Sequence, residues 1–184
     1  GLHVVPFKKP TTEELDHDFL WRVHKEVPAK GQIAIFNRSH YEDIIAVRVK
    51  KIFPDPVWKR RYKHVLDFES MLAEEGTVII KLFLNISKEE QKKRLESRLQ
   101  DPDKLWKFCM DDLDDRNRWD EFQTAYQDLI EKTSTPEAPW YIIPADRKWY
   151  RNLVVARLMV EKLRHLQLSL PTPNFDPASI IIPD

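Results

Sequence analysis

The sequence predicts an α/β fold, in which a parallel sheet is flanked by helices on both faces. Short apolar runs alternate along the chain with longer amphipathic segments, which is the pattern of strands connected by helices. Thr11 with Glu14 and Ser87 with Glu90 have the spacing of capping boxes, which mark helix starts. With 184 residues, the chain is long enough for one domain with a single core.

The order of the expected elements follows from apolar periodicity and from the positions of Pro and Gly. Strands are expected at residues 3–7, 32–37, 77–85 and 140–144. Helices are expected at residues 12–27, 41–49, 56–75, 87–100, 115–132 and 148–166. The segment 41–49 is the least determined, because its Ile and Val residues also suit a strand, and a helix is the choice made here.

A dense group of polar residues follows the apolar run at 33–36. Arg38, Ser39, Glu42 and Asp43 bring together a guanidinium, a hydroxyl and two carboxylates. Open α/β sheets bind ligands beyond the carboxyl ends of their strands, and these groups suit phosphate and metal ions. The simpler interpretation, a strand followed by a polar helix start, remains open from residue types alone.

The carboxyl ends of parallel strands meet at one edge of a sheet, so residues that follow different strands are expected to lie near one another. The residues concerned are Lys8, Asn37, Arg38, Asn85 and Asp146.

Charge is segregated along the chain, although the formal net charge is zero. Residues 48–64 contain seven Lys or Arg residues and only one acidic residue, Asp55, whereas residues 101–121 contain eight acidic residues. A basic strip suggests a polyanionic ligand, and nearby acids suggest a divalent metal. The alternative interpretation is two solvated helix faces.

Several classes of protein are disfavoured by what the sequence lacks. No apolar stretch approaches membrane-spanning length, and the single Cys109 excludes an intrachain disulfide, so we expect a cytoplasmic protein with no membrane partner. The glycines are Gly1, Gly31 and Gly76, and none begins the Gly-Lys-Ser/Thr sequence that ends a phosphate-binding loop. Either the protein does not transfer phosphate, or its first strand, loop and helix lie outside these residues.

Several long motifs, in order over residues 1–168, resemble the polyphosphate kinase 2 family. They are the segments 14–22, 36–43, 67–72, 90–94, 101–116 and 144–150. The resemblance implies a P-loop kinase fold of the thymidylate-kinase-like kind, with a kinase core at 1–168, a helical lid at about 101–118 and a C-terminal arm or tail at 169–184. It also implies that the first strand and the phosphate loop of that fold are absent from this chain.

The resemblance further implies an activity, which is phosphoryl transfer between inorganic polyphosphate and AMP or ADP with Mg²⁺ as cofactor. Asn37, after the strand phenylalanine, and Glu42, five positions on, resemble the family class that accepts both AMP and ADP. The expected partners are polyphosphate and AMP, ADP or ATP. A homo-oligomer, dimer or tetramer, is expected, and no nucleic acid.

Site residues are carried over from the family only where the motifs match. Catalytic roles are expected for Arg38 and for the lid residues Arg116 and Arg118, and a metal role for Asp43. Nucleotide or phosphate binding is expected for Asp16, Arg22, Asn37, Glu42, Lys81, Lys92, Lys93 and Arg94.

Simpler roles compete with these assignments. Asn37 could cap the following helix, and Lys92, Lys93 and Arg94 could form a solvated face. Two other functions also remain open: an ATP-dependent nucleoside monophosphate kinase, and a non-catalytic module that binds polyanions or nucleic acid through basic and aromatic residues.

Overall fold

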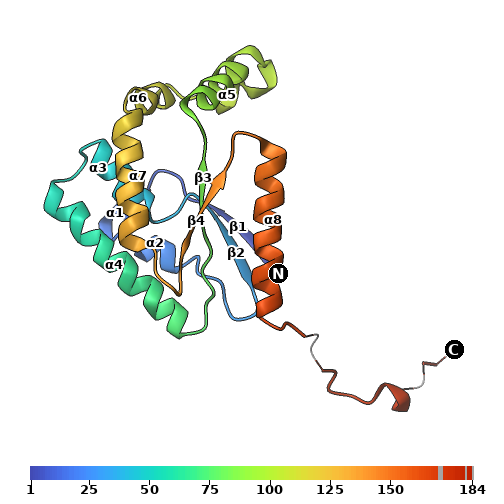
Figure 1. Ribbon diagram of the computed structural model, residues 1–184. Coiled ribbons are helices and arrows are strands. Elements are labelled where there is room, and N and C mark those ends of the chain that lie inside the picture. Colours follow the sequence, from blue (N-terminus) through green and yellow to red (C-terminus); the bar gives the residue numbers. More distant parts are fainter. Residues whose placement is uncertain (170–171, 181, 184) are drawn as a thin grey trace.

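The computed structural model describes residues 1–169, 172–180 and 182–183, and it is an α/β structure (Figure 1). Its strands are β1 (Leu2–Pro6), β2 (Ile33–Asn37), β3 (Lys81–Asn85) and β4 (Trp140–Pro144). Its α-helices are α1 (Thr12–Asp16), α2 (Trp21–His24), α3 (Glu42–Val49), α4 (Asp55–Glu74), α5 (Lys88–Gln100), α6 (Asp111–Asn117), α7 (Trp119–Thr133) and α8 (Lys148–His165). Two 3₁₀ helices are also present, η1 (Pro102–Lys107) and η2 (Pro177–Ser179). Helices α4 and α7 lie on one side of the strands and α8 on the other.

The strands form two parallel pairs instead of the single sheet expected from the sequence. Strand β1 pairs with β2 in the register Leu2↔Ile33, and β3 pairs with β4 in the register Lys81↔Trp140. The prediction of parallel strands flanked by helices is therefore confirmed. Within the described residues, however, the four strands do not form one continuous sheet.

The prediction of one long helix at 12–27 is wrong. Two short helices, α1 and α2, occupy this segment with a turn between them. The Thr11–Glu14 capping box starts α1 as predicted, but His17 adopts an extended conformation and ends it. The carboxylate of Asp18 then accepts a hydrogen bond from the Leu20 amide at 2.9 Å. Such a local side-chain bond competes with helix continuation, which the apolar spacing alone did not reveal.

Two other expected elements have different bounds. The strand expected at 77–85 begins only at Lys81, because β4 offers a five-residue partner and leaves residues 77–80 without a ladder. The segment 115–132 belongs to two helices, α6 and α7, which meet at Arg118. The ambiguous segment 41–49 is a helix, as chosen.

Most of the core lies between α3, α4 and α7. Ile44, Ile45, Val65 and Leu129 are almost completely buried there, and Trp140 of β4 packs against them. A smaller cluster of Val5, Phe7, Val23 and Phe68 joins β1 and α2 to α4. These contacts fix the positions of α3 and of the turn that precedes it.

One face of the β1–β2 pair is apolar and exposed. Leu2 and Val4 of β1 are opposite Ile33 and Ile35 of β2, and each of the four side chains is at least 40% exposed. The apolar run at 33–36 indicates a buried strand, but on this face β2 is exposed.

The C-terminal segment leads away from the body of the molecule after α8 (Figure 1). The expected arm or tail at 169–184 falls partly on residues 170–171, 181 and 184, which lie outside the described residues. Within the described part of the chain, no helix is both long and apolar enough to cross a membrane.

The packing predicts a large stability loss for Leu129→Ala, because the cavity left in the core adds to the lost burial of the side chain. We expect the free energy of unfolding to fall by about 2–5 kcal/mol, measured by urea denaturation. Leu99→Ala, at a half-exposed position on α5, is the matched control and is expected to change it by about 0.5 kcal/mol or less. Equal losses in the two variants would contradict this account of the core.

Candidate functional site

Hydrogen bonds continue each strand pair one step beyond its carboxyl end. The Phe7 amide donates to the Asn37 carbonyl at 3.1 Å, and the Ala145 amide donates to the Asn85 carbonyl at 2.8 Å. Each pair thus brings together the residues that follow its own two strands. The prediction that all five residues, from both pairs, meet at one edge stays a prediction, because the strands form two separate pairs. The end of the β1–β2 pair carries the larger set of expected site residues.

Arg38 is the most unusual backbone position at this edge. Its φ angle is 63°, in the left-handed region, and its side chain is exposed. This conformation costs a non-glycine residue of the order of 1 kcal/mol or more and persists only where the surrounding structure holds it. Backbone strain of this kind is concentrated at functional sites, so Arg38 is the strongest candidate for contact with a ligand.

The first turn of α3 brings Glu42 close to charges from two other segments. The charges of Arg38, of Asp115 on α6 and of Lys50 all act on its carboxyl group. Burial raises the pKa of the Glu42 carboxyl, although the nearby Arg38 guanidinium opposes this. Glu42, Arg38 and Asp115 of the expected lid segment therefore lie close enough for their charges to interact.

A second charged group surrounds Asp43 beside the β1–β2 pair. The buried guanidinium of Arg22 donates to the Lys8 carbonyl at 3.0 Å, and Arg61 donates to the Asp43 carbonyl at 2.6 Å. Burial raises the pKa of Asp43, against the opposing charges of Arg22 and Arg61. Arg22 also lines a cavity of about 350 Å³ beside β1, together with Lys8 and Lys9. Asp16 lies exposed at the end of α1.

Asp43 is also the expected metal ligand. No group of three or more His, Cys, Asp or Glu side chains suited to a metal ion occurs in the part of the chain that the structure describes. Asp43 does have one buried carboxylate oxygen, Oδ2, without a hydrogen-bond partner. Magnesium is often held by one or two carboxylates together with substrate phosphates, so the residues present could supply one ligand.

The two arginines of the expected lid contact backbone carbonyls in this structure. Arg116 donates to the Lys88 carbonyl at 2.7 Å and to Gln91, and Arg118 donates to the Val49 carbonyl at 2.8 Å. A salt bridge of 2.7 Å between Lys50 and Asp115 also joins the end of α3 to α6. The arrangement anchors the lid segment to α3 and α5.

The remaining expected cations lie elsewhere. Lys92 and Lys93 are exposed on α5, where Lys92 is near Glu96. Arg94 donates to the Ala145 carbonyl at 2.6 Å and to Glu90 at 2.8 Å, so its guanidinium holds the turn after β4. The structure thus favours the solvated-face interpretation for the two lysines and a structural one for Arg94.

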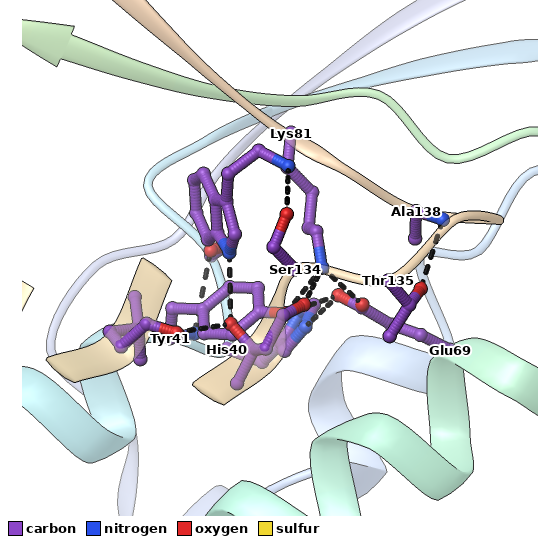
Figure 2. Close-up of polar contacts among 11 residues, drawn as sticks. His40, Tyr41, Glu69, Lys81, Ser134, Thr135 and Ala138 are labelled. Atoms are coloured by element: carbon purple, nitrogen blue, oxygen red, sulfur yellow. Dashed lines mark hydrogen bonds and ion pairs between the residues drawn. The ribbon is translucent and has the colours of Figure 1, made fainter. Parts of the chain in front are cut away.

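Lys81 does not have the surroundings expected for a residue lining a polyphosphate channel. Its side chain is buried, and its ammonium group contacts Glu69, Tyr41 and the Thr133 carbonyl at 2.7, 3.1 and 2.6 Å (Figure 2). Because an ammonium group has three donors, these contacts leave none for a phosphate.

Sequence reasoning did not identify Glu69, the buried partner of Lys81. Two signals could have revealed it. Glu69 lies on the apolar side of α4, in line with Tyr62 and Val65, and Lys81 interrupts an apolar run. A buried acid and a buried base in such positions are usually partners.

Comparison with known proteins decides the family. The polyphosphate kinase 2 (PPK2) family model matches residues 1–170. The chain belongs to the polyphosphate kinase 2 family. It is 53% identical to an AMP/ADP-polyphosphate phosphotransferase of Meiothermus ruber, over 99% of this chain and 68% of that protein. It is 39% identical to an ADP-polyphosphate phosphotransferase of Rhodopseudomonas palustris, over 93% of this chain and 63% of that protein.

A solved structure supports the same assignment. Polyphosphate kinase 2 from Arthrobacter aurescens TC1 is 49% identical, with a TM-score of 0.93, and the match covers 97% of this chain and 63% of that one. The chain thus spans about two thirds of the length of the relatives it matches. Its fold and family are those of polyphosphate kinase 2, and the relatives are named as phosphotransferases.

The raised pKa of Glu42 predicts how stability depends on pH. The Glu42 carboxyl binds its proton more tightly in the native state than in the unfolded chain. The free energy of unfolding therefore falls as pH rises from the unfolded-state pKa of Glu42 to its native-state pKa, because ionised Glu42 destabilises the fold. Glu42→Gln is therefore expected to raise the urea midpoint at pH 7.5 and to change it less at pH 4. The exposed Glu137→Gln serves as control, with no change expected at either pH. A lower midpoint for Glu42→Gln at pH 7.5 would contradict the analysis.

Proposed function

We propose that the full-length protein transfers a phosphoryl group between inorganic polyphosphate and AMP or ADP. The observation that carries the proposal is the strained, exposed Arg38 at the end of β2, flanked by Asn37 and followed by Glu42. The family match and the 53% identity to an AMP/ADP-polyphosphate phosphotransferase support the same activity.

Phosphoryl transfer depends on alignment and charge neutralisation more than on a covalent catalyst. The guanidinium of Arg38 can donate two parallel hydrogen bonds to the oxygens of a phosphoryl group. In this proposal, Asn37 and Glu42 orient the nucleotide. In this proposal, Arg116 and Arg118 exchange their backbone carbonyl partners for phosphate oxygens when the lid closes and excludes water.

Two further components complete the proposed P-loop kinase site. Asp43 would contribute its unpartnered oxygen to Mg²⁺, which, when bound, neutralises phosphate charge. These 184 residues contain no Gly-Lys-Ser/Thr loop. We therefore propose that a phosphate-binding loop from outside them completes the binding site for the polyphosphate. The basic strip at 48–64, with Arg60 and Lys63 exposed on α4, would attract the polyanion.

The test is Arg38→Ala in the full-length protein, assayed with AMP, polyphosphate and magnesium for the formation of ADP and ATP. Loss of an oriented donor to the transferred group is expected to lower kcat by about 10²–10³-fold. The thermal midpoint should change little, because the Arg38 side chain is exposed. Arg157→Ala removes an exposed arginine on α8 and is expected to retain wild-type activity.

Other outcomes separate the competing functions. Wild-type activity in Arg38→Ala would overturn the site assignment. Transfer from ATP to AMP without use of polyphosphate would instead support a nucleoside monophosphate kinase. Absence of transfer, together with salt-sensitive binding of RNA as tight as that of polyphosphate, would support a binding module.

A further inference from the structure

A buried group of polar side chains joins four elements of the fold (Figure 2). Its members are His40 and Tyr41 before α3, Glu69 of α4, Lys81 of β3 and Thr133 at the end of α7. All five residues are less than 9% exposed. None of them contacts a ligand in the proposed reaction, so the mechanism above leaves the group unexplained.

Glu69 is the centre of this buried network. Its Oε1 atom accepts a hydrogen bond from the Tyr41 hydroxyl at 2.6 Å and lies 3.3 Å from His40 Nε2. Its Oε2 atom accepts from the Lys81 ammonium at 2.7 Å. One oxygen of the Glu69 carboxylate therefore contacts two consecutive residues, His40 and Tyr41. The other oxygen contacts Lys81, whose positive charge balances that of the carboxylate.

The buried charges stabilise one another. Burial alone would raise the pKa of Glu69, yet His40, Lys81 and Tyr41 together hold it below its ordinary value. Burial lowers the pKa of Lys81, although Glu69 opposes the change. Burial and the Glu69 charge both raise the pKa of Tyr41, which therefore keeps its hydroxyl proton. Both carboxylate oxygens of Glu69 are paired, whereas His40 Nδ1 has no hydrogen-bond partner. Paired buried contacts of this kind hold their members in one arrangement.

The turn at residues 38–41 is closed by backbone hydrogen bonds, from the Glu42 amide to the Ser39 carbonyl at 3.0 Å and from the Asp43 amide to the His40 carbonyl at 3.2 Å, but it lacks a strong side-chain cap. Tyr41 is the N-cap of α3 and makes no side-chain capping bond, and the Ser39 hydroxyl accepts from the Tyr41 amide only at 3.4 Å. Arg38, three residues before Tyr41, has the strained φ of 63°. A strained turn without a strong cap needs support from tertiary contacts, and the contacts of Glu69 with His40 and Tyr41 provide it.

We propose that Glu69 is a positioning residue for the Arg38 turn. Through Tyr41 and His40 it fixes the direction in which Arg38 and Glu42 face the substrate. Lys81 supplies the counter-charge that allows the carboxylate to be buried. The inference rests on the proposed function for its catalytic consequence, whereas the ordering of the turn can be measured without any substrate.

Two double variants of the full-length protein separate positioning from stability. Glu69→Gln with Lys81→Met removes both charges but keeps an oxygen that can accept from Tyr41. Glu69→Leu with Lys81→Met removes the same charges and also the acceptor. Replacing a buried ion pair by apolar side chains often leaves stability unchanged or raises it, so the second variant need not be the less stable one. Val65→Ala, one turn earlier on α4, controls for general loosening of the core.

The expected result is a loss of kcat/KM for AMP of about tenfold or more in the Leu–Met variant relative to the Gln–Met variant. This loss should appear even where the thermal midpoints are equal. Val65→Ala should lose stability with little loss of kcat/KM. A kcat/KM that simply follows the thermal midpoint across the three variants would overturn the proposal.

A second measurement is hydrogen exchange of the amides of residues 38–42 without substrate. It tests the ordering of the turn by Glu69 separately from the proposed function. Exchange is expected to be faster in the Leu–Met variant than in both the Gln–Met variant and Val65→Ala. Equal exchange in the two double variants would overturn positioning, whatever the activity. Faster exchange in the Leu–Met variant, in a protein whose wild type transfers no phosphate, would overturn the proposed function while supporting the ordering of the turn by Glu69.

Discussion

The buried ion pair between Glu69 and Lys81 is the interaction on which the rest of the structure depends. It joins the middle of α4 to the first residue of β3, and Lys81 extends the connection to the last turn of α7 through the Thr133 carbonyl. Elements far apart in the sequence are thus held by directional contacts as well as by apolar packing. Breaking one side of such a pair is expensive, because the remaining charge stays buried without a partner.

The pair also explains why the site can tolerate strain. Arg38 is held in a left-handed conformation while its side chain stays exposed, and the following residues, His40 and Tyr41, are buried and bonded to Glu69. In the proposed role of Glu69, these contacts hold the backbone that follows Arg38, and the exposed side chain extends from it. A phosphoryl-transfer site benefits from this arrangement, since its donors must be oriented before the substrate arrives.

Much of the fold could be predicted because it depends on local patterns. The Thr11–Glu14 box, the prolines at the start of α4 and the apolar run of β2 each determine their element from nearby residues. The break after Asp16 and the late start of β3 could not be predicted in the same way. The break depends on one side-chain hydrogen bond of Asp18. The start of β3 depends on the length of its partner β4, which begins at Trp140, 55 residues after β3 ends at Asn85.

The candidate site shows the same division. Arg38 and Glu42 could be identified because they follow a recognisable strand within a family motif. The surroundings of Lys81 and Arg94 could not, because whether a cation faces solvent or a buried acceptor is decided by tertiary packing. In both cases the acceptors, Glu69 and the Ala145 carbonyl, lie on other elements of the fold.

The exposed apolar face formed by Leu2, Val4, Ile33 and Ile35 affects the solubility of the polypeptide. Side chains of this kind, displayed along a two-stranded ribbon with free backbone groups on its flanks, attract other copies of the same ribbon. A preparation of these 184 residues alone would therefore tend to precipitate on concentration.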